Sequence, residues 1–297
     1  MIARTAAAVI LLAGSIAFAS TPQALLDAAN RGDAQAQIAL ATQLAKEGKR
    51  AEAVVWLRKA AEAGSAEAQN DLAACFASGA GMPSVDLPAA VKWYRRAAEQ
   101  GYVPAQRNLA ICYDIGQGVD PDPVEAAKWY RKAAAAGDPA AELGLGVMLI
   151  NSTGSEKNVA EGVQLVRKAA DANFAAAQVT LGDLYRGGEG VQRDFPEAVR
   201  WYRKAADQGY PDGELFLGSA YENGRGVPKD PEEAAKWYRK YAAHGSPDAQ
   251  YQLGVNFIHG NGVPQNLKEG IEWLRKAAAQ GNKPAAAELK NLDQPSQ

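Results

Sequence analysis

A block made of an aromatic or aliphatic pair followed by two cations returns along this chain at an almost constant interval. From the first block onward, the separations are 37 residues once and 36 residues five times. The blocks begin at Trp56, Trp93, Trp129, Leu165, Trp201, Trp237 and Trp273. A fixed period of this length is typical of repeat proteins, in which each unit buries its apolar face only against its neighbours. The 297 residues therefore predict one repeat array rather than two independent domains.

Each unit has the pattern of two helices. The first helix carries a leucine and, four residues later, an aromatic or aliphatic residue, as in Leu253 and Phe257. That spacing places both on one helical face, and the small residue after the leucine lets a second helix approach closely. The second helix begins near an Asp-Pro pair and ends at a glycine such as Gly245, which suits a left-handed C-terminal cap. The pattern predicts an all-α fold of about seven helical hairpins without β-sheet.

A Gly-x-Gly sequence joins the two helices in five of the units. A glycine-rich turn is also found in phosphate-binding loops, but here no strand precedes it and no Lys-Ser/Thr follows it. Because it recurs in phase with the repeat, we interpret it as a structural turn. One unit departs from the pattern: Asn151–Ser155 replaces the turn, Leu165 replaces tryptophan, and Asn173 replaces the capping glycine.

Together these features resemble the Sel-one-like repeat (SLR), a relative of the tetratricopeptide repeat with a longer internal turn. The resemblance covers about 66–281, and residues 34–64 are closer to a plain tetratricopeptide hairpin because they lack the Gly-x-Gly turn. It implies an α/α superhelical solenoid used as an adaptor. We expect a signal peptide at 1–19, a half-helix at 20–33, a short hairpin at 34–64, six SLRs at 65–282, and a capping helix and tail at 283–297.

The N-terminus has the pattern of an export signal. A short positive start is followed by the apolar run Ala6–Ile16 and then by Ala17-Phe18-Ala19, an A-x-A cleavage site. We expect cleavage after Ala19, no transmembrane segment after it, and a periplasmic or secreted monomer; an uncleaved anchor is the alternative.

No motif of the sequence indicates catalysis. Two histidines, His244 and His259, lie in different parts of the repeat, and neither His-Glu-x-x-His nor Cys-x-x-Cys occurs. Some relatives in the family are linked to penicillin binding, but Ser-x-x-Lys, Ser-Asp-Asn and Lys-Thr-Gly are all absent. We expect no enzyme, with a penicillin-binding hydrolase as the third option, and no metal or cofactor. Cys75 and Cys112 occupy one slot in adjacent repeats, too far apart for a disulfide.

The paired cations of the blocks form a ladder along the array. One interpretation is a surface for an envelope glycan or anionic lipid. We favour the other, in which last-turn cations complement the helix dipole and pair with carboxylates of neighbouring repeats. The formal net charge of −2 gives no basic excess and argues against nucleic acid.

Specificity is expected where repeats differ, on the side of the first helix opposite its core leucine. This stripe varies in size and polarity and is apolar in several units, which indicates a protein or peptide partner in a concave groove. Its candidate residues are Arg107, Ile111, Leu143, Val147, Val179, Leu215, Tyr251 and Val255. Contact with the next repeat is the alternative. The leading prediction is an exported, non-enzymatic adaptor for a signalling or assembly partner.

Overall fold

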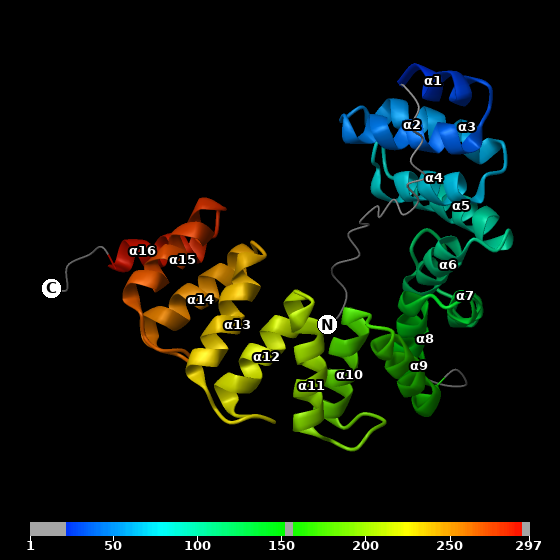
Figure 1. Ribbon diagram of the computed structural model, residues 1–297. Helices are drawn as coiled ribbons and strands as arrows, with labels where there is room; N and C mark the ends of the chain where they lie inside the picture. Colours follow the sequence, from blue (N-terminus) through cyan, green and yellow to red (C-terminus); the bar gives the residue numbers. More distant parts are fainter. Residues whose placement is uncertain (1–21, 152–156, 293–297) are drawn as a thin grey trace. The chain divides into compact units, whose positions relative to one another are not determined.

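The computed structural model describes residues 22–151 and 157–292, and within them it contains sixteen helices and no strand (Figure 1). The predicted signal peptide, the turn residues 152–155 and the last five residues lie outside the described parts. The helices are α1 (Pro22–Asn30), α2 (Ala34–Lys46), α3 (Arg50–Glu62), α4 (Ala66–Ser78), α5 (Leu87–Glu99), α6 (Val103–Ile115), α7 (Pro123–Ala135), α8 (Pro139–Asn151), α9 (Val159–Asp171), α10 (Ala175–Gly187), α11 (Phe195–Asp207), α12 (Pro211–Asn223), α13 (Pro231–Ala243), α14 (Pro247–His259), α15 (Leu267–Ala279) and α16 (Lys283–Leu292).

The chain divides into two compact units, which we describe separately: unit 1 holds the described residues up to Met148, and unit 2 those from Leu149 onward. In unit 1, α2 packs on α3, α4 on α5 and α6 on α7; in unit 2, α10 packs on α11, α12 on α13 and α14 on α15. Each hairpin also contacts the next one in its unit, for example through α5 and α6. The all-α stack of hairpins predicted from the period is confirmed. None of the described helices is long and apolar enough to cross a membrane.

Caps set the helix ends where the punctuation residues predict them. Asp194 accepts a hydrogen bond from the Glu197 amide at 2.9 Å and so satisfies one free donor at the start of α11. First helices end at left-handed glycines such as Gly224, with φ of 67°. Asn173 takes the same left-handed region, with φ of 64°, and no other described non-glycine residue has a positive φ. The expectation that asparagine replaces the capping glycine in this degenerate repeat is confirmed.

The second glycine of the Gly-x-Gly turn has a role beyond turning the chain. A Cβ at Gly118 would lie 2.4 Å from the carbonyl oxygen of Leu87, and a Cβ at Gly226 would lie 2.3 Å from that of Phe195. Leu87 and Phe195 each begin the second helix of the preceding hairpin. The turn therefore touches the neighbouring repeat backbone to backbone, which only glycine permits.

The small residues after the core leucines also act as predicted. Leu181 and Leu217 are fully buried. The glycine that follows each of them lies under the ring of a tyrosine from the second helix, and a Cβ at Gly182 would lie 2.5 Å from the Tyr202 ring. These close approaches hold the two helices of a hairpin together.

A buried glutamine ties each of five first helices to the helix before it. Its amide donates to a carbonyl oxygen eight residues earlier, as from Gln178 to Ala170 at 3.2 Å. The side-chain oxygen of Gln178 in turn accepts from Gln208 at 2.8 Å. In the next repeat the equivalents are Glu214 and His244, whose Oε2 and Nε2 atoms are 2.9 Å apart. One hydrogen-bonded pair has replaced another at the same place in the fold.

This exchange gives a first prediction. The Glu214 side chain is 4% exposed, so His244→Ala leaves a buried carboxylate without its partner. We expect a loss of about 2 kcal/mol in the free energy of unfolding. The double change Glu214→Gln with His244→Gln recreates the Gln178–Gln208 pair and should cost less than about 0.5 kcal/mol. Urea denaturation of the three proteins tests this, and equal stability of His244→Ala and the parent protein contradicts it.

The two cysteines give a second prediction. Cys75 and Cys112 are free and buried, and burial raises the pKa of each thiol to about 11. In the native protein we expect each to react with an aromatic disulfide reagent ~100-fold or more slowly than an exposed thiol, because the thiolate is the reactive form. Both should react at once in urea. A gain of two hydrogens in mass on reducing the monomer contradicts the prediction of no disulfide.

Candidate partner-binding site

In the six blocks that begin with tryptophan, the second cation lies over the tryptophan ring three residues before it. The distance from the charged group to the ring centroid is 3.6 Å for Lys204 over Trp201 and 4.5 Å for Arg96 over Trp93. The other contacts of this kind are Lys59–Trp56, Lys132–Trp129, Lys240–Trp237 and Lys276–Trp273. One face of each ring is therefore covered by a cation, which stabilises the helix end and leaves little room there for a sugar ring.

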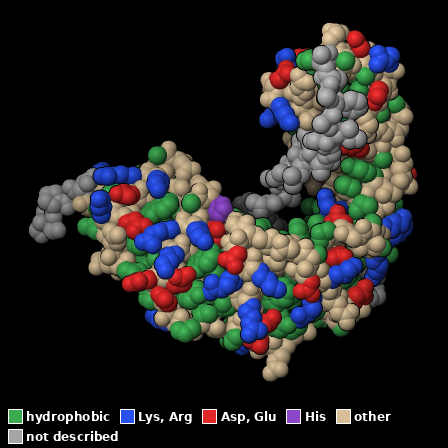
Figure 2. Space-filling model, viewed as in Figure 1, with side chains coloured by type: hydrophobic (Ala, Val, Ile, Leu, Met, Phe, Trp, Pro, Cys, Tyr) green, Lys and Arg blue, Asp and Glu red, His purple; other side chains and the backbone are tan. Residues whose placement is uncertain are grey.

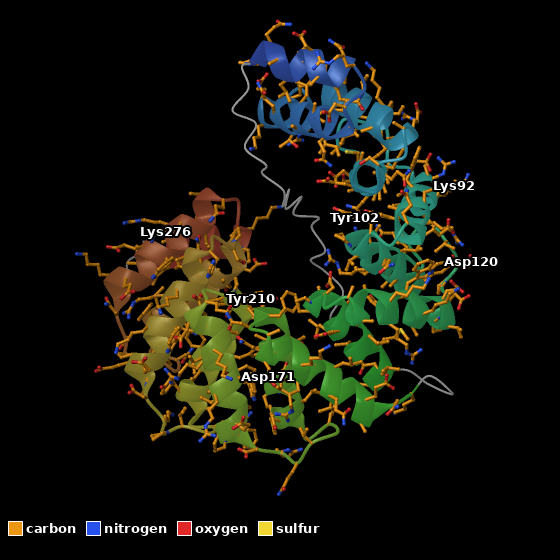
Figure 3. All side chains as sticks on the ribbon, turned by 45° about the vertical axis from the view of Figure 1, so that its right-hand side comes forward. Lys92, Tyr102, Asp120, Asp171, Tyr210 and Lys276 are labelled. Carbon is orange, nitrogen blue, oxygen red and sulfur yellow. The ribbon has the colours of Figure 1, made fainter. Side chains whose placement is uncertain are left out.

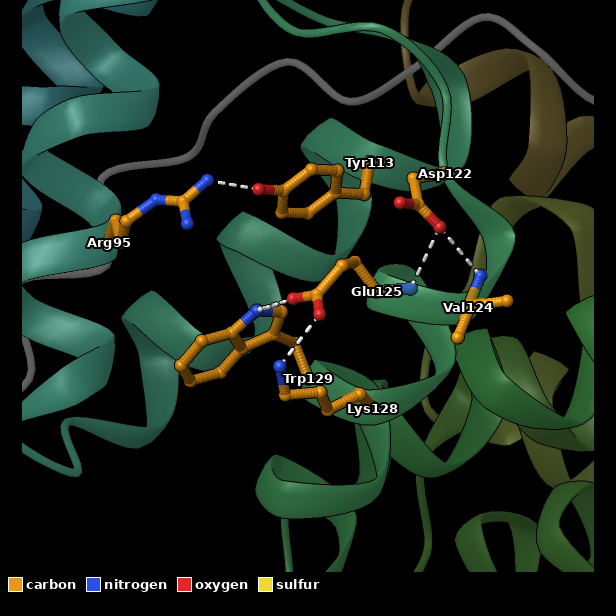
Figure 4. Close-up of polar contacts among 7 residues, drawn as sticks. All are labelled: Arg95, Tyr113, Asp122, Val124, Glu125, Lys128 and Trp129. Atoms are coloured by element: carbon orange, nitrogen blue, oxygen red, sulfur yellow. Dashed lines mark hydrogen bonds and ion pairs between the residues drawn. The ribbon is translucent and has the colours of Figure 1, made fainter.

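In five of the seven blocks, the first cation reaches an aromatic side chain of the next first helix. Arg167 donates to the Tyr185 hydroxyl at 2.5 Å, and Arg239 lies 4.8 Å from the centroid of Phe257. Figure 4 shows the same contact between Arg95 and Tyr113, beside Glu125 and the Trp129 indole. The cation ladder stabilises the packing of the repeats, as favoured from the sequence. The prediction that its partners are carboxylates of neighbouring repeats was partly wrong. Among the described first cations, only Arg239 forms an ion pair, with Glu269 at 2.6 Å, and the recurring partners are aromatic rings.

The surface does not concentrate this positive charge. In unit 2, Lys and Arg side chains on the visible face alternate with Asp and Glu (Figure 2). Exposed pairs such as Arg200–Glu197 and Lys236–Glu233 contribute to that mixture. A single-sign field, which steers anionic polymers, is not formed on this face.

In unit 2, the predicted stripe packs against neighbouring hairpins. Val179 is 6% exposed and belongs to a buried cluster with Tyr202 and Leu217. Leu215 is half-buried against the cluster that contains Tyr238 and Trp273. Tyr251 and Val255 are half-buried against Ile258, Leu274, Ala277 and Ala285. For these four residues, the structure shows the contact with the next repeat that the sequence left open as the alternative.

In unit 1, the stripe lines a cavity. Arg107 and Ile111 of α6 and their equivalents Asn70 and Ala74 of α4 all face a cavity of about 870 Å³. Residues of α2, α3 and α5 complete its wall. Its exposed lining residues Arg50 and Ser78 show that it opens to solvent. Tyr102, another lining residue, lies on the side of the unit away from Lys92 and Asp120 (Figure 3). Leu143 and Val147 are half-buried on α8 and do not line this cavity.

Polar contacts fix part of the cavity wall. Asn108 donates its amide to Asn70 Oδ1 at 2.9 Å, and Asn70 donates to the Asp71 carboxylate at 3.2 Å. The Arg107 guanidinium pairs with Asp138, which also caps α8. Arg107 therefore holds a neighbouring repeat as well as lining the cavity.

The electrostatics of the cavity centre on Asp71. Burial raises the pKa of its carboxyl to about 6, the hydrogen bond from Asn70 opposes this, and the like charge of Glu67 adds to it. Among the residues that the structure describes, neither Asp71 nor Glu67 forms an ion pair. Glu67 accepts a hydrogen bond from Gln35 at 3.3 Å.

Sequence reasoning did not single out Asp71, Glu67 or Asn108. A signal was present for Asp71, since it is the only carboxylate at its position in the repeat. The equivalent residues are Ala39, Asn108, Gly144, Thr180, Phe216 and Gln252. Over residues 22–151 and 157–292, no three His, Cys, Asp or Glu side chains gather as a metal site requires.

Comparisons with known proteins agree with this architecture. The Sel1 repeat family model matches seven times, at residues 34–65, 66–102, 103–138, 139–174, 175–210, 211–246 and 247–282. A Sel1 repeat protein from Oxalobacter formigenes is 32% identical, with a TM-score of 0.66, over 81% of this chain and 96% of that one. A protective antigen from uropathogenic Escherichia coli strains, displaying an SLR fold, is 36% identical with a TM-score of 0.63. That match covers 90% of this chain but only 58% of the antigen.

More distant likenesses concern the fold alone. An immunity protein from Pseudomonas aeruginosa is 24% identical over 78% of this chain and 89% of its own, with a TM-score of 0.51. No curated protein matches the chain.

Proposed function

The chain belongs to the Sel1 repeat family, whose members are generally protein-interaction scaffolds, and from this we propose that it is an exported, non-enzymatic adaptor that holds a protein or peptide segment. The observation that carries the proposal is the cavity of unit 1. It gathers stripe residues from two adjacent first helices, α4 and α6, into one solvent-open wall. Such a concave surface of variable residues is where solenoids bind extended partners.

Within the stripe, the proposed contacts centre on Ile111 and Arg107, together with Ala74 and Asn70. Leu143 and Val147 belong to the same stripe on α8, and we expect them to contact the partner outside the cavity. Leu215, Tyr251, Val255 and Val179 contribute mainly to packing in unit 2, because they lie against buried clusters. The partner is therefore expected on unit 1.

Site-specific photocrosslinking tests this placement, and it supplies a third prediction. A photoreactive residue at Ile111 should capture a partner from envelope extract, and Ile111→Glu should reduce partner recovery more than about 10-fold with nearly unchanged melting. The matched control is Val55→Glu on α3, where the side chain is 54% exposed and does not line the cavity. It should leave recovery unchanged. Equal recovery with Ile111→Glu, or unfolding by it, contradicts the proposed site.

Export is the second part of the proposal. It is supported by the pattern of residues 1–19, which lie outside the described structure. Protein recovered from the periplasm or medium should begin at Ser20. Recovery of the uncleaved chain with the membrane fraction would overturn this part alone.

A further inference from the structure

The repeat can fold without the negative charge of Asp71. Its neutral equivalents in the other repeats support the same helix at the same place. The next repeat has an asparagine there, Asn108, with nearly the same shape. A partly buried carboxylate without a cation is unfavourable for folding, so the presence of Asp71 indicates a role in binding rather than in stabilising the repeat.

The groups that face Asp71 leave its charge unbalanced. Glu67 and Cys75 lie on its own helix, Tyr94 comes from α5, and Tyr102 is the residue before α6. Arg107 of α6 lines the same cavity. Arg107 is the single cation among them, and its guanidinium pairs with Asp138 instead. Arg50, the other cation of the wall, is exposed at the rim.

The cavity also offers further acceptors and an apolar wall. Asn108 donates its amide hydrogen to Asn70, while its Oδ1 accepts no hydrogen bond from the residues that the structure describes. Ala74, Ala77 and Ile111 provide an apolar surface beside these groups. An aliphatic stem with a cationic end matches this combination of surfaces, because the stem packs while the charge meets carboxylates.

We propose that the unit 1 cavity receives a lysine or arginine side chain of the partner, with its charged end against the Asp71 and Glu67 carboxylates. This rests on the proposed function and adds the chemistry of the partner. It assigns Asp71 as the residue that selects a basic side chain over an apolar one of equal length. The aliphatic stem lies along Ala74 and Ile111.

Small probes test the selection without a known partner. The mature protein, with its Asp side chains labelled with ¹³C at the carboxyl carbon, is titrated in NMR experiments with N-acetyl-lysine methylamide and with N-acetyl-norleucine methylamide. Norleucine has a similar stem without the charge. We expect the lysine probe to shift the Asp71 resonance and to bind at least about 10-fold more tightly at pH 7.5. Its affinity should fall about 10-fold at pH 5, where Asp71 becomes protonated.

Variants separate this inference from the proposed function. Asp71→Asn should bring the lysine probe to the affinity of the norleucine probe, whereas Glu99→Gln, an exposed change outside the cavity, should leave both affinities unchanged. Equal binding of the two probes by the parent protein overturns the inference, and so does an absence of binding. Neither result affects the capture of a partner at Ile111, which tests the proposed function by itself.

Discussion

Gly226→Ala is expected to remove about 3 to 4 kcal/mol from the free energy of unfolding of the hairpins around it. Two costs add at this position. An alanine at φ of 79° is strained by about 1–2 kcal/mol. Its Cβ would also lie 2.3 Å from the Phe195 carbonyl oxygen and 2.8 Å from the Pro196 nitrogen, both backbone atoms at the start of α11. Relieving such overlap moves one hairpin against the next and costs about 1–3 kcal/mol more.

The matched control is Gly245→Ala, at the end of α13. Gly245 has φ of 95°, but a Cβ there would meet no atom within 4 Å. The control therefore carries only the conformational strain, about 1–2 kcal/mol. Urea denaturation followed by circular dichroism compares the two. If they cost the same, the second glycine of the turn serves the turn alone and not the contact between repeats.

The period made the hairpins predictable because every unit repeats the same caps, leucines and glycines. The cation–tryptophan contacts could also be predicted from the sequence. Trp201 and Lys204 are three residues apart on one helix, so their side chains share a face. The close approach of Gly226 to Phe195 was not predictable in the same way. It depends on how one hairpin sits on the next, which the residues of a single turn do not determine.

The same dependence limited the prediction of the site. Whether Ile111 or Tyr251 meets solvent depends on the local packing between successive hairpins. Both residues occupy the variable side of a first helix, yet Ile111 lines a cavity and Tyr251 packs on a buried cluster. Asp71 could be noticed as an exceptional carboxylate in the sequence. The burial of the Asp71 carboxylate could not be predicted, because residues of several helices meet around it only in the folded protein.

Asp71→Asn is expected to stabilise the protein at neutral pH. The native pKa of about 6 is above the ordinary value of 3.8, so between these values the native protein holds a proton that the unfolded chain releases. The contribution of Asp71 to stability is therefore most favourable below pH 4 and is lost as the pH rises through 6. A shift of this size corresponds to about 3 kcal/mol, reduced to about 2 kcal/mol for partial exposure.

The gain must therefore depend on pH. At pH 7 the variant should be more stable than the parent protein by about 2 kcal/mol, while at about pH 3, below both pKa values, Asp71 is largely protonated in both states and the difference should approach zero. Asparagine keeps the acceptor for the Asn70 amide, so the packing of α4 is retained. Urea denaturation at both pH values, followed by circular dichroism, measures the difference. A variant less stable than the parent at pH 7 would show that the Asp71 charge stabilises this wall, and the functional argument for retaining it would fail.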